Sequence, residues 1–588
     1  MIKFISICIT LEFIKEIGRL NNNLKQNQMK LFKACLTLLA FVALISSCKN
    51  PKEQMEKDLR TFIAKYDSIV QPLQKESNLA YWNASISGKP EDWKKSEDLS
   101  IKLTGIYSNK EDFTILKKIK ESGSVKDTIL SRELEVLYNS YLGAQVDTAK
   151  LNAVIKMQTA VEQKFSNFRA DVGGKKITDN DVEDILKKST NSKELQQAWE
   201  GHKAIGPVVA GDIIKLVKKR NEIAKELRFN NYHEMSLKLS EQDPAEISKL
   251  FDELDELTRG AFAGLKGEID DYLAKRDKVK KEDLMPWHYQ NRFFQEAPAI
   301  YTVDLDKYYK GQNIEKLTTD YYNSIGLDMA AMMAKSDLYE KPGKNQHAYC
   351  IDIDNKGDVR VLGNIKPNAS WMGTMLHEFG HANYDKYIDP KLPFILRNPA
   401  HTFTTEAIAM FFGRMSSNAE FLVDMKLTDT ADARMVAAES FKVLRLEQLT
   451  FSRWAQVMYR FEKGMYENPD QDLNKLWWDL VEKYQMIKRP AGRNQPDWAT
   501  KIHIASYPCY YHNYLLGELL ASQLNHYIAA NVLKSADFKQ SYYGKTKVGA
   551  YLKENVFMTG ARFSWNDMIE KATVEKLTAK YYAEQFVK

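Results

Sequence analysis

Two histidines four positions apart, His377 and His381, constrain this chain more than any other feature of its sequence. Residues with this spacing share one face of an α-helix, so both imidazoles can bind the same metal ion if the segment is helical. Glu378 lies one step round that helix, where it can hydrogen-bond a metal-bound water without being a ligand itself. The flanking residues are apolar, whereas two incidental histidines on a solvated helix would have polar neighbours. The motif HEFGH therefore predicts a catalytic zinc-binding helix.

A catalytic zinc site needs a third protein ligand and one open coordination position. The residue three positions after His381 is Tyr384, which rules out the extended motif that places a glycine there and a third histidine beyond it. Glu406 is the only charged residue in the otherwise apolar segment 404–412. Such a residue could merely interact with the helix dipole, but a carboxylate among apolar neighbours is costly unless it is paired or binds a metal. Its position 25 residues after His381 suits two antiparallel helices, and we predict that Glu406 completes a site for one Zn²⁺ ion.

The spacing of apolar residues predicts a mainly helical protein. Segments with clear helical periodicity are 52–69, 213–227, 246–275 and 437–467. Residues 347–362 instead alternate between apolar and polar types around an Asn-Lys-Gly turn, which predicts a β-hairpin. At 588 residues the chain is longer than single cores usually grow. We therefore expect a two-lobed helical metallopeptidase with a deep central cleft and a small β-hairpin beside the zinc helix.

The charge pattern excludes one class of partner. The chain has 84 basic and 78 acidic residues, and no basic block is interleaved with aromatic residues. Grooves that bind nucleic acids combine these two features, so we expect no nucleic acid as a partner.

The N-terminal region indicates export from the cytoplasm. Lysines near Met29 precede the apolar stretch 34–45, which is too short to span a membrane and is typical of a secretion signal. The small residues directly before Cys48 resemble a bacterial lipoprotein signal, in which the cysteine becomes the lipidated first residue. An uncleaved N-terminal anchor is the alternative. Because Met29 opens a complete signal, residues 1–28 are interpreted as an upstream extension from a misassigned start.

These signals define the expected organisation of the chain. Residues 29–47 would be the signal peptide, 48–60 the lipidated cysteine and a linker, and 61–588 the catalytic domain. The protein would be a monomer outside the cytoplasm, attached by its lipid to a bacterial membrane, which we expect to be the outer membrane. Of the cysteines, only Cys350 and Cys509 would remain free for a disulfide, and their pairing is left open.

An aromatic segment with interleaved polar residues follows in the C-terminal part. Tyrosines at 507, 510, 511 and 514 surround Lys501 and His503. Aromatic clusters usually belong to the hydrophobic core, but a core without a function would not require the histidine and the lysine between these tyrosines.

The combined motifs resemble the angiotensin-converting-enzyme family of peptidyl-dipeptidases, and more distantly the thimet oligopeptidases. The segments that carry the resemblance are HEFGH, TEAIA from Thr405, WWDLVEKYQ from Trp477, the K-x-H and tyrosine tail, and His347-Ala348 thirty positions before His377.

The resemblance implies a role for each matching residue. His377, His381 and Glu406 would bind zinc, and Glu378 would activate the zinc-bound water. His503 and Tyr514 would stabilise the tetrahedral intermediate. The backbone of His347 and Ala348, together with the side chains of Lys501, Tyr511 and Tyr507, would bind a short peptide, with Lys501 and Tyr511 holding its C-terminal carboxylate.

Some family positions differ in this chain. Val481 and Asn513 replace the arginines of the chloride sites, so we predict no chloride activation, and Met410 replaces an aspartate that would orient Glu406. The glutamine partner of the substrate carboxylate falls near residues 287–290 in a register that remains open. The segment from His503 to Tyr514 is one residue longer than the family pattern. Two alternatives therefore remain, an oligopeptidase that cuts internally in short peptides and a catalytically silent peptide-binding lipoprotein.

Overall fold

A computed structural model describes residues 15–34 and 51–587. Residues 15–34 are helical. Most of the predicted signal peptide and Cys48 lie outside the described residues. Helix α2 (Pro51–Ser87) confirms the helical segment predicted at 52–69, and it also includes most of the range 48–60 that was assigned to the lipidated cysteine and a linker. Proline is favoured in the first turn of a helix, where its missing N–H group is not needed.

The N-terminal half is almost entirely helical. Its elements after α2 are α3 (Pro90–Tyr107), α4 (Lys110–Ser122), α5 (Thr128–Gly143), α6 (Thr148–Asn167), the short hairpin β1 (Ala170–Val172) and β2 (Lys175–Ile177), α7 (Asp179–Lys188), α8 (Ser192–Lys203), α9 (Ile205–Glu226), α10 (Tyr232–Leu239) and α11 (Pro244–Asp277).

The C-terminal half contains the zinc motif. Its elements are α12 (Asp306–Tyr309), α13 (Ile314–Ser324), α14 (Ala330–Lys335), β3 (Tyr349–Asp352), β4 (Val359–Leu362), α15 (Ala369–Lys386), α16 (Thr402–Gly413), α17 (Ala419–Asp424), α18 (Thr430–Glu467), α19 (Leu473–Leu480), α20 (His503–Ser506), α21 (His512–Tyr527), α22 (Thr546–Leu552), α23 (Trp565–Thr573) and α24 (Lys580–Phe586).

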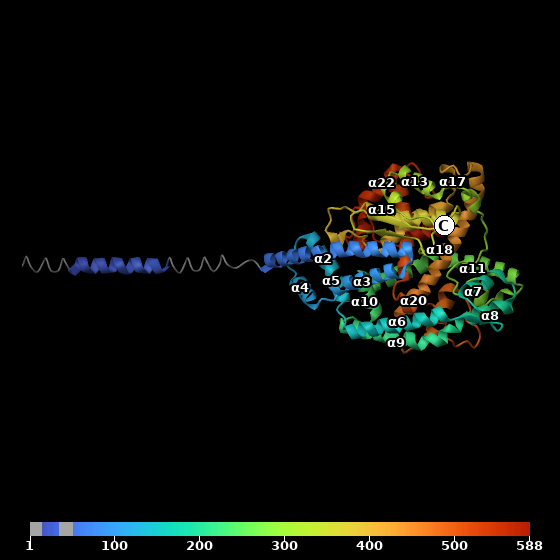
Figure 1. Ribbon diagram of the computed structural model, residues 1–588, viewed down its shortest axis with the longest axis horizontal. Coiled ribbons are helices and arrows are strands. Elements are labelled where there is room, and N and C mark those ends of the chain that lie inside the picture. Colours follow the sequence, from blue (N-terminus) through green and yellow to red (C-terminus); the bar gives the residue numbers. More distant parts are fainter. Residues whose placement is uncertain (1–14, 35–50, 588) are drawn as a thin grey trace, which may run out of the picture.

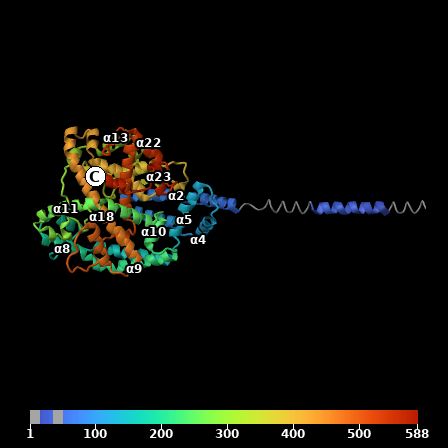
Figure 2. The same cartoon turned by 180° about the vertical axis from the view of Figure 1, so that it is seen from behind.

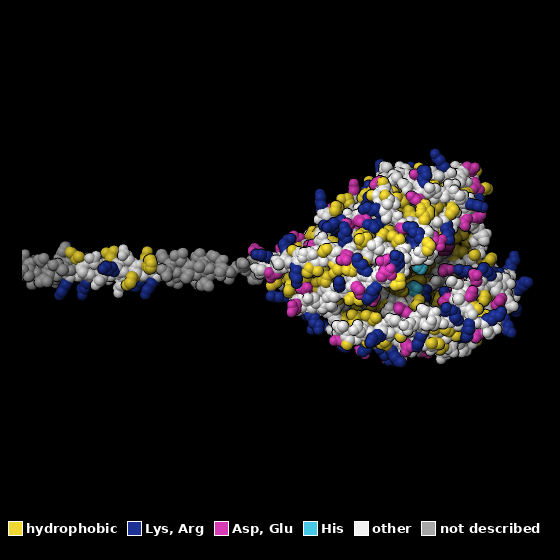
Figure 3. All heavy atoms as spheres, viewed as in Figure 1, with side chains coloured by type: hydrophobic (Ala, Val, Ile, Leu, Met, Phe, Trp, Pro, Cys, Tyr) yellow, Lys and Arg dark blue, Asp and Glu magenta, His cyan; other side chains and the backbone are white. Residues whose placement is uncertain are grey.

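The helices form two lobes, as the sequence predicts. One lobe gathers α13, α15, α17 and α22, the other gathers α6 to α9, and α18 runs from one to the other (Figure 1). The view from behind shows the same division (Figure 2). Between the lobes the surface is hollowed, and histidine side chains are visible inside the hollow (Figure 3). A buried apolar core extends through both lobes, so the cleft is flanked by closely packed helices.

The predicted β-hairpin is confirmed beside the zinc helix. Strands β3 and β4 pair in antiparallel register, with Tyr349 opposite Leu362 and Asp352 opposite Val359. The turn between them includes Asn355 at φ 50° and Gly357 at φ 96°, both in the left-handed region that Asn and Gly adopt most readily. Both strands contact α15, and the hairpin is therefore fixed against the helix that carries HEFGH.

Helices α15 and α16 approach each other closely because of one glycine. A Cβ atom added to Gly380 would lie 2.8 Å from the Cα atom of Ala409, closer than two such atoms can pack. Gly380 is the fourth residue of HEFGH, between the two histidines. The glycine inside the motif therefore lets α16 pack directly against the zinc helix.

Two further observations concern the whole described part of the chain. Cys350 and Cys509 are both free thiols, so they do not form a disulfide. Among the helices of residues 15–34 and 51–587, none has the length and apolar character needed to cross a membrane.

Candidate metal and peptide-binding site

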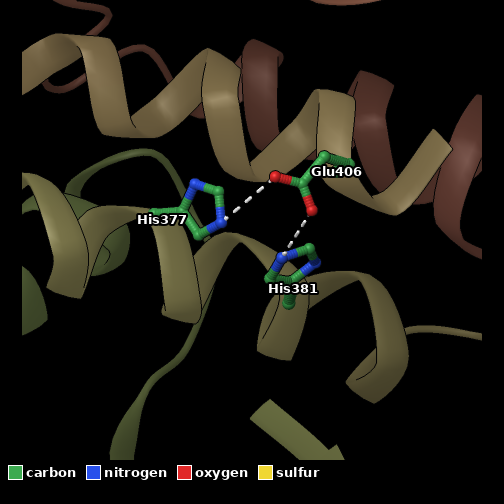
Figure 4. A group of neighbouring side chains, drawn as sticks. All are labelled: His377, His381 and Glu406. Carbon is green, nitrogen blue, oxygen red and sulfur yellow. Dashed lines mark ion pairs between the residues drawn. The ribbon is translucent and has the colours of Figure 1, made fainter. Parts of the chain in front are cut away.

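The structure brings the three predicted metal ligands together. The imidazole Nε2 of His377 lies 3.5 Å from Glu406 Oε1, and Nε2 of His381 lies 3.5 Å from Glu406 Oε2. One ligand atom from each residue lies within 4.8 Å of the others (Figure 4). Both histidines project from α15, and Glu406 projects from the neighbouring α16. Among the described residues, no other group of three such side chains is close enough to hold one ion.

Neighbouring residues fix the orientation of these ligands. His381 Nδ1 lies 2.8 Å from the hydroxyl oxygen of Thr405, which leaves Nε2 facing Glu406. Helix α15 begins at Asn368, whose side chain accepts a hydrogen bond from the Trp371 N–H group. The buried Tyr322 hydroxyl donates to the Leu376 carbonyl, directly before the motif. The His381 imidazole is therefore held by a hydrogen bond, and the backbone of α15 is fixed at its first turn and directly before the motif.

The electrostatics suit a divalent cation. Burial lowers the pKa of His377 to about 4 and that of His381 to about 3, so both rings are neutral at pH 7 and can act as ligands. Burial also raises the pKa of Glu406 to about 7. A buried carboxylate without a cation is unfavourable, and a metal ion would remove this cost. Two neutral imidazoles and one carboxylate are a donor set that zinc prefers, so the residues present fit this metal.

Glu378 lies beside the three ligands without belonging to their group. Its side chain is buried, and burial together with the charge of Glu406 raises its pKa to about 8. A carboxyl group with a pKa near neutrality can accept and return a proton. The sequence prediction assigned it the role of base, and its position and proton affinity allow that role.

A cavity of about 730 Å³ opens from the metal ligands toward β3 and α2. All four residues of β3 line it, together with Ala348. Strand β3 pairs with β4 along one edge, and no described strand covers its other edge. Asn78 of α2 donates to the Asp352 carbonyl at 3.0 Å. A strand edge beside a cavity can bind an extended peptide through its remaining backbone hydrogen-bonding groups. The backbone N–H of His347 already donates to Asn345 Oδ1, and the His347 side chain is exposed.

The aromatic tail forms a second group of side chains near the metal ligands. The ring of His503 lies 5.4 Å from that of Tyr511, which lies 5.4 Å from that of Tyr514. Burial lowers the pKa of His503 to about 4, so its neutral ring can donate a hydrogen bond. Burial raises the pKa of Tyr514 above its usual value, and the charge of Glu406 raises it further. Tyr507 is 62% exposed and lies at the rim, 5.7 Å from His503.

Lys501 is buried, and within the described residues it has no carboxylate partner. Its ammonium donates to Gln295 Oε1 at 2.5 Å and lies over the rings of Phe293, Trp454 and Tyr511 at 5.2 to 5.4 Å. Burial lowers the pKa of Lys501 to about 8. This arrangement leaves a buried positive charge that an anionic group of a ligand can neutralise.

Gln295 is the one residue of this group that the sequence did not identify. Sequence reasoning placed the glutamine near residues 287–290, but Gln290 turns toward the Ala299 N–H group instead. The segment 289–301 has no periodicity, and its course is set by Asn291, whose side chain accepts hydrogen bonds from Phe293 and Gln295 N–H groups. A second glutamine five residues downstream was the only available signal.

Comparisons with known proteins identify the family. A family model described as angiotensin-converting enzyme matches residues 53–586. The chain belongs to the angiotensin-converting enzyme family.

Curated relatives have low sequence identity to the chain. The angiotensin-converting enzyme of Theromyzon tessulatum is 22% identical, over 88% of this chain and 87% of the relative. That of Rattus norvegicus is 24% identical, over 67% of this chain and 32% of the relative. That of Bos taurus is 22% identical, over 81% of this chain and 37% of the relative. The match thus spans about a third of the rat and bovine proteins.

The positions that differ from the family pattern have other partners here. Asn513 accepts a hydrogen bond from Gln242 at 2.7 Å, and Val481 is buried in the core. The Met410 sulfur lies 3.3 Å from a Cβ atom placed on Gly517 of α21.

Proposed function

We propose that the chain is a zinc-dependent peptidase that releases dipeptides from the C-terminus of short peptides. The observation that carries this proposal is the buried, unpaired ammonium of Lys501 beside Gln295 and Tyr511. A substrate's C-terminal carboxylate is the natural partner of such a charge. Binding of that carboxylate would fix the distance from the chain end to the bond that is cut, which restricts the product to a constant length.

The residues around the metal ligands support hydrolysis. His377, His381 and Glu406 would hold one zinc ion, which when bound supplies a Lewis acid for the peptide carbonyl and the attacking water. Glu378 would remove a proton from that water and transfer it to the departing amine. His503 and Tyr514 would donate hydrogen bonds to the oxygen that becomes negative during the reaction. The free edge of β3 and Ala348 would hold the peptide in an extended form.

The proposal is tested with a pentapeptide and its C-terminal amide. We expect the acid to be shortened by two residues and the amide to react far more slowly, because the amide cannot pair with Lys501. Mass spectrometry identifies the products. Equal turnover of both peptides would reject dipeptide release.

Internal cleavage of short peptides is the second candidate. The additional residue between His503 and Tyr514 favours it, since that spacing departs from the peptidyl-dipeptidase pattern. Products of several lengths from one peptide, formed equally from acid and amide, would identify this activity. A silent peptide-binding protein would instead show no turnover with bound zinc.

We further propose that a lipid on Cys48 attaches the protein to a bacterial outer membrane as a monomer. The apolar segment 34–45 followed by small residues and a cysteine supports this localisation. Expression of the full chain with Cys48→Ala tests it. We expect the variant to leave the membrane fraction, and an unchanged distribution would reject the lipid anchor.

A further inference from the structure

The cavity beside the metal ligands is a different space from the pocket of Lys501. Its lining includes His377, His381 and Glu406, but none of the described side chains that contact the Lys501 ammonium. A peptide with its C-terminal carboxylate at Lys501 and its cut bond at the metal ligands would extend its N-terminal part into this cavity. The side chains that line the cavity would therefore select the residues before the cut bond.

Asp385 lies on the same side of α15 as the two histidines of the motif. His377, His381 and Asp385 are four residues apart in turn, so they follow one face of the helix, and all three line the cavity. Four helical residues span about 6 Å along the axis. Two residues of an extended peptide span a similar length, at about 3.4 Å each. Asp385 is thus within reach of the two substrate residues before a bond that is cut at the metal ligands.

The Asp385 carboxylate has no cationic partner among the described residues. Its one hydrogen-bond contact is with the Cys350 thiol of β3, whose sulfur lies 3.9 Å from Asp385 Oδ2. Asp352 lies two residues further along β3 and faces the same side of the strand as Cys350. Its own carboxylate oxygens accept hydrogen bonds from the N–H groups of Asp354 and Gly357 in the hairpin turn. Asp352 therefore adds negative charge beside Asp385 without neutralising it.

The cavity offers little positive charge of its own. Among the described residues that line it, Arg397 is the one arginine or lysine, and its Nε atom donates to the Leu392 carbonyl at 2.7 Å. Burial and the charge of Asp352 raise the pKa of Asp385 to about 7. A carboxylate in such surroundings is costly without a cation, and a positively charged group of a substrate would remove this cost.

We propose that Asp385 is a specificity-determining residue that binds a lysine or arginine side chain on one of the two substrate residues before the cut bond. This inference rests on the proposed peptidase function and adds a substrate class to it. A carboxylate forms charge-assisted hydrogen bonds with an ammonium or a guanidinium group, and these are stronger than hydrogen bonds between neutral groups. A free N-terminal ammonium of the substrate carries the same charge, and the experiment separates these two sources.

Acetylated peptides with a free C-terminal carboxylate provide the test. Lysine or norleucine occupies one of the two positions before the cut bond, and the acetyl group removes the N-terminal charge. We expect kcat/KM of the original protein to be roughly 10- to 100-fold higher for the lysine peptide, as is typical of a hydrogen bond to a charged group. Asp385→Asn should bring the ratio of the two kcat/KM values close to one, and Asp385→Glu should restore part of it.

Asp389→Asn is the matched control. Asp389 lies four residues after Asp385, outside the lining of the cavity, and its side chain accepts a hydrogen bond from the Lys391 N–H group. This variant changes the net charge by the same amount and should keep the ratio of the original protein. Equal ratios in Asp385→Asn and Asp389→Asn would overturn the proposal. A dependence on Asp385 that appears only with unacetylated peptides would assign it to the N-terminal ammonium and reject the basic side chain.

Binding without turnover separates this inference from the proposed function. In calorimetry, Glu378→Gln should bind the lysine peptide more tightly than the norleucine peptide, and adding Asp385→Asn should remove the difference. That result, together with no cleavage by the original protein, would uphold the role of Asp385 and reject the peptidase. Equal affinities of Glu378→Gln for the two peptides would overturn the role of Asp385, even if Asp385→Asn does not fold.

Discussion

Replacement of Lys501 by methionine gives the sharpest test of the proposed release of C-terminal dipeptides. Methionine keeps an unbranched apolar side chain in contact with Phe293, Trp454 and Tyr511, but it lacks the ammonium that lies 2.5 Å from Gln295 Oε1. The change therefore removes a charge and little packing. A peptide carboxylate that enters this position would find only Gln295 and Tyr511 as partners.

The expected loss follows from the burial of this charge. Lys501 is 7% exposed, and with a pKa of about 8 it is about nine-tenths protonated at pH 7. Removal of one partner from a buried charge pair costs about 3–5 kcal/mol. Because the remaining partners still donate hydrogen bonds, we take the lower end, about 3 kcal/mol. At about 1.4 kcal/mol per tenfold, kcat/KM for a peptide acid should fall roughly 100-fold.

The assay compares one peptide as its acid and as its C-terminal amide, in the original protein and in Lys501→Met. Both proteins should cleave the amide at similar low rates. The ratio of kcat/KM for the acid to kcat/KM for the amide should therefore be large in the original protein and close to one in Lys501→Met. Zinc content and the midpoint of thermal unfolding serve as controls for folding. An equal loss for acid and amide, or an unchanged ratio, would refute the assignment of Lys501 to the substrate carboxylate.

Further predictions concern pH, catalysis, metal binding and packing. Lys501 loses its charge as the pH rises through about 8, so KM for peptide acids should increase above pH 8. KM for peptide amides should stay constant, and initial rates from pH 6.5 to 9.5 would measure both. Glu378→Gln should retain zinc and lose turnover by at least about 100-fold, in keeping with the usual contribution of a general base; unaltered turnover would exclude it as the base. Glu406→Gln should lose most of its zinc in equilibrium dialysis, and full retention would remove Glu406 from the ligand set. Gly380→Ala should destabilise the protein by about 1–3 kcal/mol in urea unfolding, because its Cβ would lie 2.8 Å from Ala409 Cα, and an unchanged midpoint would contradict the close packing of α15 and α16.

The cluster of His377, His381 and Glu406 could be predicted because residues four apart share one face of a helix. His377 and His381 share one face of α15 by their separation alone. Glu406 is distant in sequence, but its charge in an apolar helix marked it as a ligand candidate. The hairpin at 347–362 could be predicted equally well, because its turn contains residue types that readily adopt positive φ.

Features that depend on tertiary packing could not be predicted from the sequence in the same way. Gln295 lies in a segment without periodicity, and only the fold shows that it reaches Lys501, 206 residues away. The boundary between the linker and the first helix was not resolved from the sequence, because the range 48–60 assigned to the linker overlaps the helical segment predicted at 52–69, and α2 begins at Pro51.

The long N-terminal helix α2 also forms part of the cavity beside the metal ligands. Tyr66, Val70, Gln74 and Asn78, four residues apart along one face, line that cavity. The first residue of a shortened protein therefore cannot be chosen freely. A version that starts within α2 beyond these residues would keep His377, His381 and Glu406 and still lose one wall of the cavity, so cuts should fall before Pro51.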